Sequence, residues 1–215
     1  MRLNDKCHPR VQLLLDVLAG ALTDLEDYSP RKYRMYVRRL LLHDPGQEPE
    51  DRLIRVMAIC LQAHHAMHQG SLDEALLLFQ QAVAMREEDD DFRYIDGMAM
   101  VRIHFDKGAH AEGFRVIGDL AATASRVHSF GPAEAYGILS LAKFGELSAS
   151  VQVPEFLDAL AQYESRFLAD KNLGLAELWR QDPERGLDIL LEHSPHPPPP
   201  WERRSDEDSS APAGT

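Results

Sequence analysis

The stretch from Gln69 to Val83 constrains the fold most, because it contains the end of one helix and the start of the next. Gly70 can adopt the left-handed backbone conformation that commonly ends a helix, since it has no Cβ atom. Ser71 and Glu74 have the spacing of a capping box, in which each side chain bonds to the backbone N–H of the other residue. The sequence therefore predicts that two antiparallel helices meet here in a short turn.

The second of these helices carries a face suited to close packing. Ala75, Phe79 and Ala82 follow one another at spacings of four and three residues, so they lie on one side of the helix. The two alanines allow a neighbouring helix to approach closely, and the phenylalanine fills the space that remains. We expect this face to be buried.

Glycines with the same predicted role recur along the chain. Gly70, Gly108 and Gly145 are separated by 38 and 37 residues, and the fifth residue after each glycine is small. These small residues are Ala75, Gly113 and Ser150. A period of this length indicates stacked helical hairpins, none of which buries its hydrophobic face alone.

The hairpin of residues 56–87 resembles a tetratricopeptide (TPR) repeat. The matching residues are Ile59, Ala63, Gly70, Ala75, Phe79 and Ala82. The resemblance extends over about residues 55–168, although Gln62, Ala66 and His104 stand where the family has a leucine or a large aromatic residue. It implies an all-α fold of TPR-like stacked antiparallel helical hairpins, an α-α superhelix. The alternative is a bundle with three glycine-ended hairpins.

The predicted organisation has three segments. Residues 1–48 form an N-terminal segment of two helices, residues 49–193 form the TPR-like domain, and residues 194–215 form a Pro- and Ser-rich disordered tail. Within the repeat domain, the expected helices cover about residues 49–69, 71–86, 92–107, 109–128, 132–144, 154–167, 173–180 and 183–192. We expect residues 148–153 to be an irregular connection.

The charge of the chain argues for a protein partner. Asp and Glu outnumber Lys and Arg by 35 to 23, and a net charge of −12 disfavours binding to nucleic acid or to an anionic membrane. Arginines and tyrosines within residues 31–39 leave nucleic-acid contact as a minor alternative. Only Cys7 and Cys60 are present, which fits a reducing compartment, and no apolar run reaches the ~20 residues that cross a bilayer. We expect a cytoplasmic protein, and the oligomeric state stays open.

The TPR resemblance also implies a binding surface. In that family the first helix of each hairpin lines a concave groove, and the corresponding residues here are His64, His68, Arg102, Asp106, Tyr136 and Lys143. The lysine and asparagine set of TPR domains that clamp chaperone C-termini is missing, since those positions read Cys60, Leu61, His64, Met98, Ala99 and Arg102. We therefore expect an adaptor, scaffold, regulator or chaperone that binds a helix or an extended protein segment.

Enzymatic chemistry is the minority interpretation. His64 and His68 are four residues apart on a predicted helix, so both can face one metal ion, with His104 as a possible third ligand. Two histidines do not complete a site, and His65 stands where the zinc-protease motif has its glutamate. We predict no catalytic residues, no metal site and no cofactor, and keep a metal-binding all-α enzyme or sensor as the alternative.

Overall fold

The computed structural model of the protein describes residues 31, 35, 38, 49–87, 90–128 and 130–193. The chain divides into two compact units, Met1–Glu87 and Glu88–Thr215. Within the described residues all regular elements are helical and none is a strand, which confirms the all-α class. Apart from helical backbone at Arg31, Met35 and Arg38, the predicted N-terminal helices and the predicted tail lie outside these residues.

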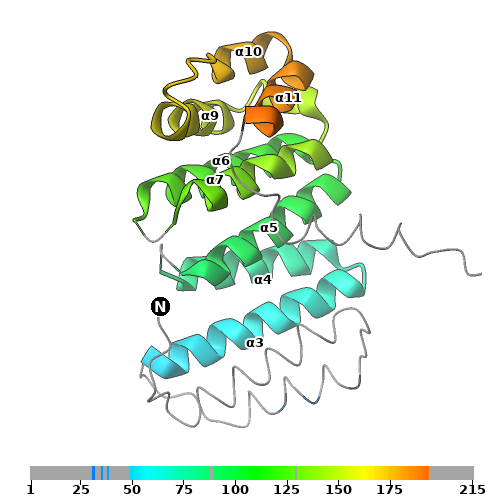
Figure 1. The fold of residues 1–215 in the computed structure, drawn as a ribbon. Helices are drawn as coiled ribbons and strands as arrows, with labels where there is room; N and C mark the ends of the chain where they lie inside the picture. Colours follow the sequence, from blue (N-terminus) through cyan, green and yellow to red (C-terminus); the bar gives the residue numbers. More distant parts are fainter. Residues whose placement is uncertain are drawn as a thin grey trace, which may run out of the picture. The chain divides into compact units, whose positions relative to one another are not determined.

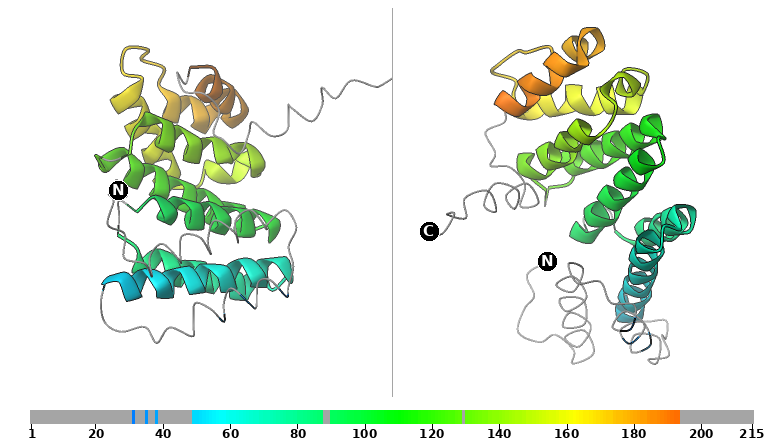
Figure 2. Two further views of the ribbon diagram at one scale, coloured as in Figure 1. Left: turned by 60° about the horizontal axis from the view of Figure 1, so that its bottom comes forward. Right: turned by 90° about the vertical axis from the view of Figure 1, so that its right-hand side faces the viewer.

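Unit 1 is described as one antiparallel hairpin. It consists of α3 (Pro49–His68) and α4 (Leu72–Met85). The two helices pack along each other and run side by side in both views of Figure 2. Ala75, Phe79 and Ala82 are fully buried, as their spacing predicts. At the open end of the hairpin, Arg52 Nε donates a hydrogen bond to the carbonyl oxygen of Met85 at 2.7 Å.

Unit 2 is built around α6, which packs against α5, α7 and α9. The α10–α11 pair lies beyond α9, so most helices contact their neighbours in sequence (Figure 1). The elements are α5 (Asp91–Asp106), α6 (His110–Arg126), α7 (Pro132–Leu139), the 3-10 helix η1 (Ser140–Phe144), α8 (Leu147–Ser150), α9 (Pro154–Phe167), α10 (Leu175–Gln181) and α11 (Pro183–His193). Among the described residues, no helix is long and apolar enough to cross a membrane.

A series of aromatic rings forms the core of unit 2. Phe105 of α5 packs against Phe114 of α6 with ring centroids 5.4 Å apart. Phe114 contacts Phe156 of α9 at 5.1 Å, and Phe156 contacts Trp179 of α10 at 5.1 Å. Phe114, Phe156 and Trp179 are fully buried. Tilted and edge-to-face pairs of this kind add to the free energy of burial, so the rings connect four helices into one core.

The turn between α3 and α4 is closed by backbone hydrogen bonds. Gly70 has a φ of +76°, and its N–H donates to Met67 O at 3.0 Å while the Ser71 N–H donates to Ala66 O at 2.9 Å. This is the pattern of a Schellman motif. The predicted capping box is wrong, because the Ser71 side chain makes no capping bond. The Ser71 backbone N–H, to which the Glu74 side chain would have to bond, already donates to Ala66 O.

The α5–α6 turn has the same bonds 38 residues later. Gly108 has a φ of +71°, its N–H donates to Phe105 O at 2.9 Å, and the Ala109 N–H donates to His104 O at 2.8 Å. Each bond corresponds to one at Gly70. Two of the three predicted glycine turns are therefore equivalent in conformation as well as in spacing.

The third glycine turn differs from the first two. Gly145 directly follows the last residue of η1, so a helix ends here as predicted, but its φ of −101° is not left-handed. The following amide, Glu146 N–H, donates to the Nδ1 atom of His110 at 3.2 Å instead of to a preceding carbonyl. The single helix predicted over residues 132–144 is split into α7 and η1. At the junction the buried Ser140 hydroxyl donates to Gly137 O at 2.8 Å, a local bond that competes with regular helix.

Two smaller expectations have opposite outcomes. The acidic run of residues 87–91 predicts a capping carboxylate for the helix that follows it. Asp90 Oδ1 accepts a hydrogen bond from the Phe92 N–H at 2.9 Å, which confirms this cap of α5. The connection predicted as irregular at residues 148–153 instead begins inside the short helix α8. The Ser150 hydroxyl there accepts a hydrogen bond from Trp179 Nε1 at 2.6 Å, which ties α8 to α10.

Candidate protein-binding surface

In unit 1, the two histidines predicted for the groove have different surroundings. His68 is exposed at the end of α3. His64 packs edge-to-face on Phe79 of α4, with ring centroids 5.0 Å apart. The Nδ1 atom of His64 is buried and has no hydrogen-bond partner. Its ring therefore belongs mainly to the interior of the hairpin.

The position of His64 determines its charge. Burial and, to a smaller extent, the neighbouring His68 together lower its pKa from 6.5 to about 4. The ring is therefore neutral at pH 7, which suits a side chain packed against an aromatic ring. A neutral imidazole can ligate a metal ion, but no group of three metal-ligating side chains occurs in the part of the chain that the structure describes.

In unit 2, Arg102 and Asp106 are exposed on the last turns of α5. The exposed fractions of their side chains are 77% and 52%, and Arg102 Nε lies 3.7 Å from Asp106 Oδ2. An exposed pair of this spacing contributes only about 0.3–0.5 kcal/mol to stability. Both side chains are therefore available to a partner at little cost to the fold.

Phe105 brings this end of α5 next to η1. Its ring stacks on the imidazole of His110 with centroids 5.5 Å apart and an interplanar angle of 29°. A Cβ atom added at Gly113 or at Gly145 would lie 2.4 Å or 2.6 Å from atoms of the Phe105 ring. The absence of side chains at these two glycines therefore makes room for the ring, and the ring joins the α5–α6 turn to the residue that follows η1.

Lys143 and Phe144 at the end of η1 complete this region. The ammonium nitrogen of Lys143 lies 4.9 Å from the centroid of the Phe144 ring, a cation–π contact. Phe144 is 62% exposed, so its ring presents apolar surface beside this charge. We name the six residues Arg102, Phe105, Asp106, His110, Lys143 and Phe144 the α5–η1 corner.

Tyr136 does not belong to this surface. It was predicted to lie near the groove, but it is only 5% exposed and forms part of the core of unit 2. The reason is that all residues from Ala135 to Leu139 of α7 are buried. Of the six residues predicted for the groove, Tyr136 therefore lies in the core of unit 2 and His64 lies inside the hairpin of unit 1. Arg102, Asp106, Lys143 and His68 are exposed.

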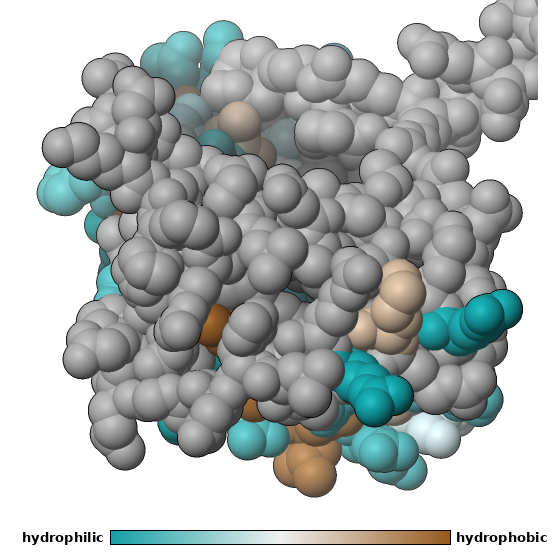
Figure 3. Space-filling view, turned by 90° about the horizontal axis from the view of Figure 1, so that it is seen from below, coloured by the Kyte–Doolittle hydropathy of each residue, from teal (hydrophilic) through white to brown (hydrophobic). Residues whose placement is uncertain are grey.

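Sequence reasoning missed Phe144 and His110. In the sequence, Phe144 marks only the end of a predicted helix, and its neighbours along the chain do not indicate that its side chain is exposed. Exposed large apolar residues occur elsewhere too, including Leu77, Ile95 and Leu191. At the lower edge of the face seen in Figure 3, hydrophobic and hydrophilic residues lie side by side.

The α5–η1 corner combines an exposed aromatic ring, two cations and one carboxylate. Such a set suits recognition of a polypeptide, since aromatic and arginine side chains dominate the binding energy of many interfaces. The chain matches no protein-family model, and no curated protein or solved structure shows significant similarity to it.

Proposed function

We propose that this chain is a TPR-like helical-repeat protein of the cytoplasm that binds an extended or helical segment of another protein, as an adaptor, scaffold, regulator or chaperone. The observation that carries the proposal is the repetition of the hairpin turn, with equivalent hydrogen bonds at Gly70 and Gly108. Repeats of this kind display the outer faces of successive hairpins as a continuous surface for a partner.

The buried positions of the two hairpins support the same interpretation. Ala75 and Phe79 of α4 correspond to Gly113 and Ile117 of α6 at a shift of 38 residues, and all four residues are buried. Small residues at the first position allow close helix packing in both hairpins. The two hairpins therefore share the packing of their second helix. The resemblance to TPR repeats rests on this packing.

Within unit 2 we propose that the α5–η1 corner contacts the partner. Phe144 provides an apolar anchor, and Arg102 provides a charge that can pair with a carboxylate of the bound segment. The net charge of −12 is consistent with a polypeptide as ligand, because it opposes nucleic acids and anionic lipids.

Affinity purification of the full chain followed by mass spectrometry tests the proposal. Arg102→Glu and Phe144→Asp should each deplete a specific partner, by about thirtyfold if the residue is a hot spot worth about 2 kcal/mol. Arg180→Glu is the matched control, because Arg180 is exposed on α10 and lies outside the corner. Partner sets that are the same for all four proteins would refute the corner as the binding surface.

A further inference from the structure

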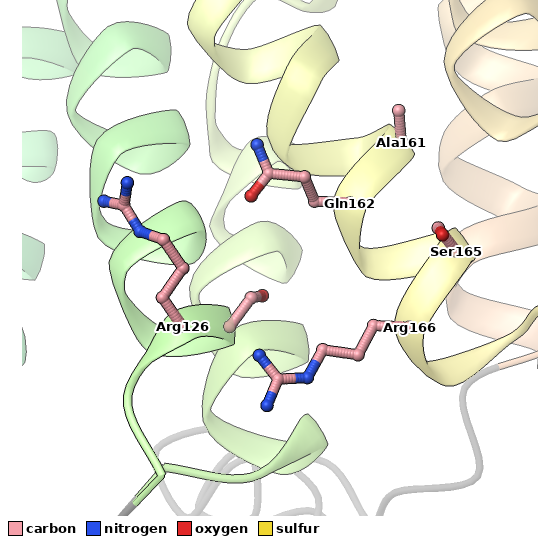
Figure 4. Close-up of a pocket in the computed structure, with 6 residues that line it drawn as sticks. Arg126, Ala161, Gln162, Ser165 and Arg166 are labelled. Atoms are coloured by element: carbon pink, nitrogen blue, oxygen red, sulfur yellow. The ribbon is translucent and has the colours of Figure 1, made fainter.

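A pocket between α6 and α9 is a second candidate site, separate from the α5–η1 corner. It has a volume of about 360 Å³ and is open to solvent. It is lined by Ser125, Arg126, Ala161, Gln162, Ser165 and Arg166. In Figure 4, Gln162 and Arg166 extend from α9 toward α6, and Arg126 stands on α6 across from them.

The pocket results from the way the two helices diverge. At Gly118, a Cβ atom would lie 2.6 Å from the backbone of Glu155 and Phe156, so α6 and α9 are in near contact there. About two turns further along each helix, small residues such as Ser125 and Ala161 leave the space open.

The polar side chains of the pocket have unused hydrogen-bonding capacity. Within the described residues, the side chains of Ser125, Arg126, Gln162 and Ser165 make no hydrogen bond, and neither Arg126 nor Arg166 forms an ion pair. The Arg166 guanidinium lies over the face of the neighbouring Phe167 ring, 5.4 Å from its centroid. Asp119 interacts electrostatically with Arg126, but the two side chains form no ion pair.

Two other arginines of unit 2, Arg115 and Arg180, are paired with carboxylates. Arg115 forms an ion pair with Glu112, and its Nε atom also lies 3.5 Å from Glu155 Oε1. The Nη1 atom of Arg180 lies 3.2 Å from Glu177 Oε2. Arg126 and Arg166 each lie in the last turn of a helix, where a cation is favoured by the helix dipole. That preference accounts for each arginine on its own helix, but it does not account for two unpaired arginines that line one pocket with two hydroxyls and an amide.

We propose that this pocket binds a phosphate group, either free or as a small-molecule monoester. Two guanidinium groups from different helices suit a tetrahedral anion with several acceptor oxygens, whereas a planar carboxylate is satisfied by one of them. Ser125, Ser165 and Gln162 add neutral donors. Because the whole chain carries a charge of −12, binding depends on these local groups and not on general attraction of polyanions.

Titration of the 15N-labelled full chain with inorganic phosphate and with phenyl phosphate, at constant ionic strength in a phosphate-free buffer, tests the assignment. The amide signals of Arg126, Gln162 and Arg166 should shift saturably, with a dissociation constant on the order of 1 mM. The Arg126→Gln/Arg166→Gln double variant should bind at least about tenfold more weakly, because the charge-assisted bonds are lost. Arg166→Lys should bind with intermediate affinity, since it keeps the charge but not the bidentate geometry.

Arg180→Gln is the control, because Arg180 also lies in the last turn of a helix but outside the pocket. It should bind phosphate as the wild type does. The proposal would be overturned if Arg180→Gln weakened phosphate binding as much as the double variant does, or if the double variant bound phosphate as tightly as the wild type. It would also be overturned if the wild type bound acetate as tightly as phosphate, or if phosphate caused no saturable shift. Should the double variant fail to fold, Arg166→Gln alone gives the same comparison, with at least about threefold weaker binding expected.

Discussion

Protonation of His64 should destabilise unit 1 in mildly acidic solution. Its pKa is about 4 in the folded chain, against 6.5 for an ordinary histidine, mainly because the ring is buried against Phe79. Between these two values the unfolded chain binds a proton that the folded chain does not. The stability that the neutral ring contributes is therefore fully present above pH 6.5 and is lost as the pH falls toward 4.

The size of the effect follows from the two pKa values. At pH 5 the unfolded imidazole is almost entirely protonated and the folded one is almost entirely neutral. The free energy of unfolding should then be about 2 kcal/mol lower than at pH 7.5 from this residue alone, and the loss should approach about 3 kcal/mol below pH 4. His64→Leu removes the titration and also the unpartnered buried Nδ1 atom, so at pH 7.5 we expect it to be close to neutral in stability.

Urea unfolding of wild type and His64→Leu at pH 7.5 and pH 5 measures this difference, and NMR titration of the imidazole signals measures the pKa directly. His128→Gln, at an exposed histidine outside unit 1, is the control substitution. His68→Gln should raise the pKa of His64 only slightly, because burial is the larger cause. A His64 ring that titrates near 6.5, or a His64→Leu variant with the same pH dependence as the wild type, would refute the reasoning.

Three substitutions test the packing of unit 2 by thermal or urea unfolding. Gly118→Ala should destabilise the protein by about 2–3 kcal/mol, because the new methyl group meets the backbone of α9; unchanged stability would mean that α6 and α9 are further apart. Ser150→Ala should cost about 1–3 kcal/mol, since it leaves the buried Trp179 Nε1–H without an acceptor. Gly145→Ala should cost about 1–3 kcal/mol, because the new methyl group meets the Phe105 ring. In a Phe105→Leu background this cost should be smaller, whereas additive effects of the two substitutions would exclude the contact.

The helix positions could be predicted from the sequence where strong local signals mark their ends. α4, α9 and α11 begin and end within about two residues of the predicted bounds. Pro154 and Pro183 stand at the first positions of α9 and α11, and Gly70 adopts a left-handed conformation before α4. These signals act through the backbone of a few adjacent residues, so they do not depend on the rest of the fold.

The candidate surfaces could be predicted only in part, because they depend on contacts between distant residues. The resemblance to TPR repeats places Arg102 and Asp106 in the predicted groove, and both side chains are exposed. Tyr136 is buried because α7 packs within the core, and Arg126 and Arg166 line one pocket only because α6 and α9 pack together. Neither relation is encoded in local spacing, so neither could be predicted from the residues adjacent in the sequence.

The three evenly spaced glycines show why a regular spacing can have more than one physical origin. Gly70 and Gly108 are needed for a positive φ, and a Cβ atom at either position would meet nothing within 4 Å. Gly145 has an extended backbone that any residue can adopt, and its lack of a side chain instead accommodates the Phe105 ring. Its neighbouring amide is satisfied by His110 from α6. Gly70 and Gly108 are therefore equivalent in backbone conformation. Gly145 has the same spacing for a different reason, which is its contact with the Phe105 ring of α5.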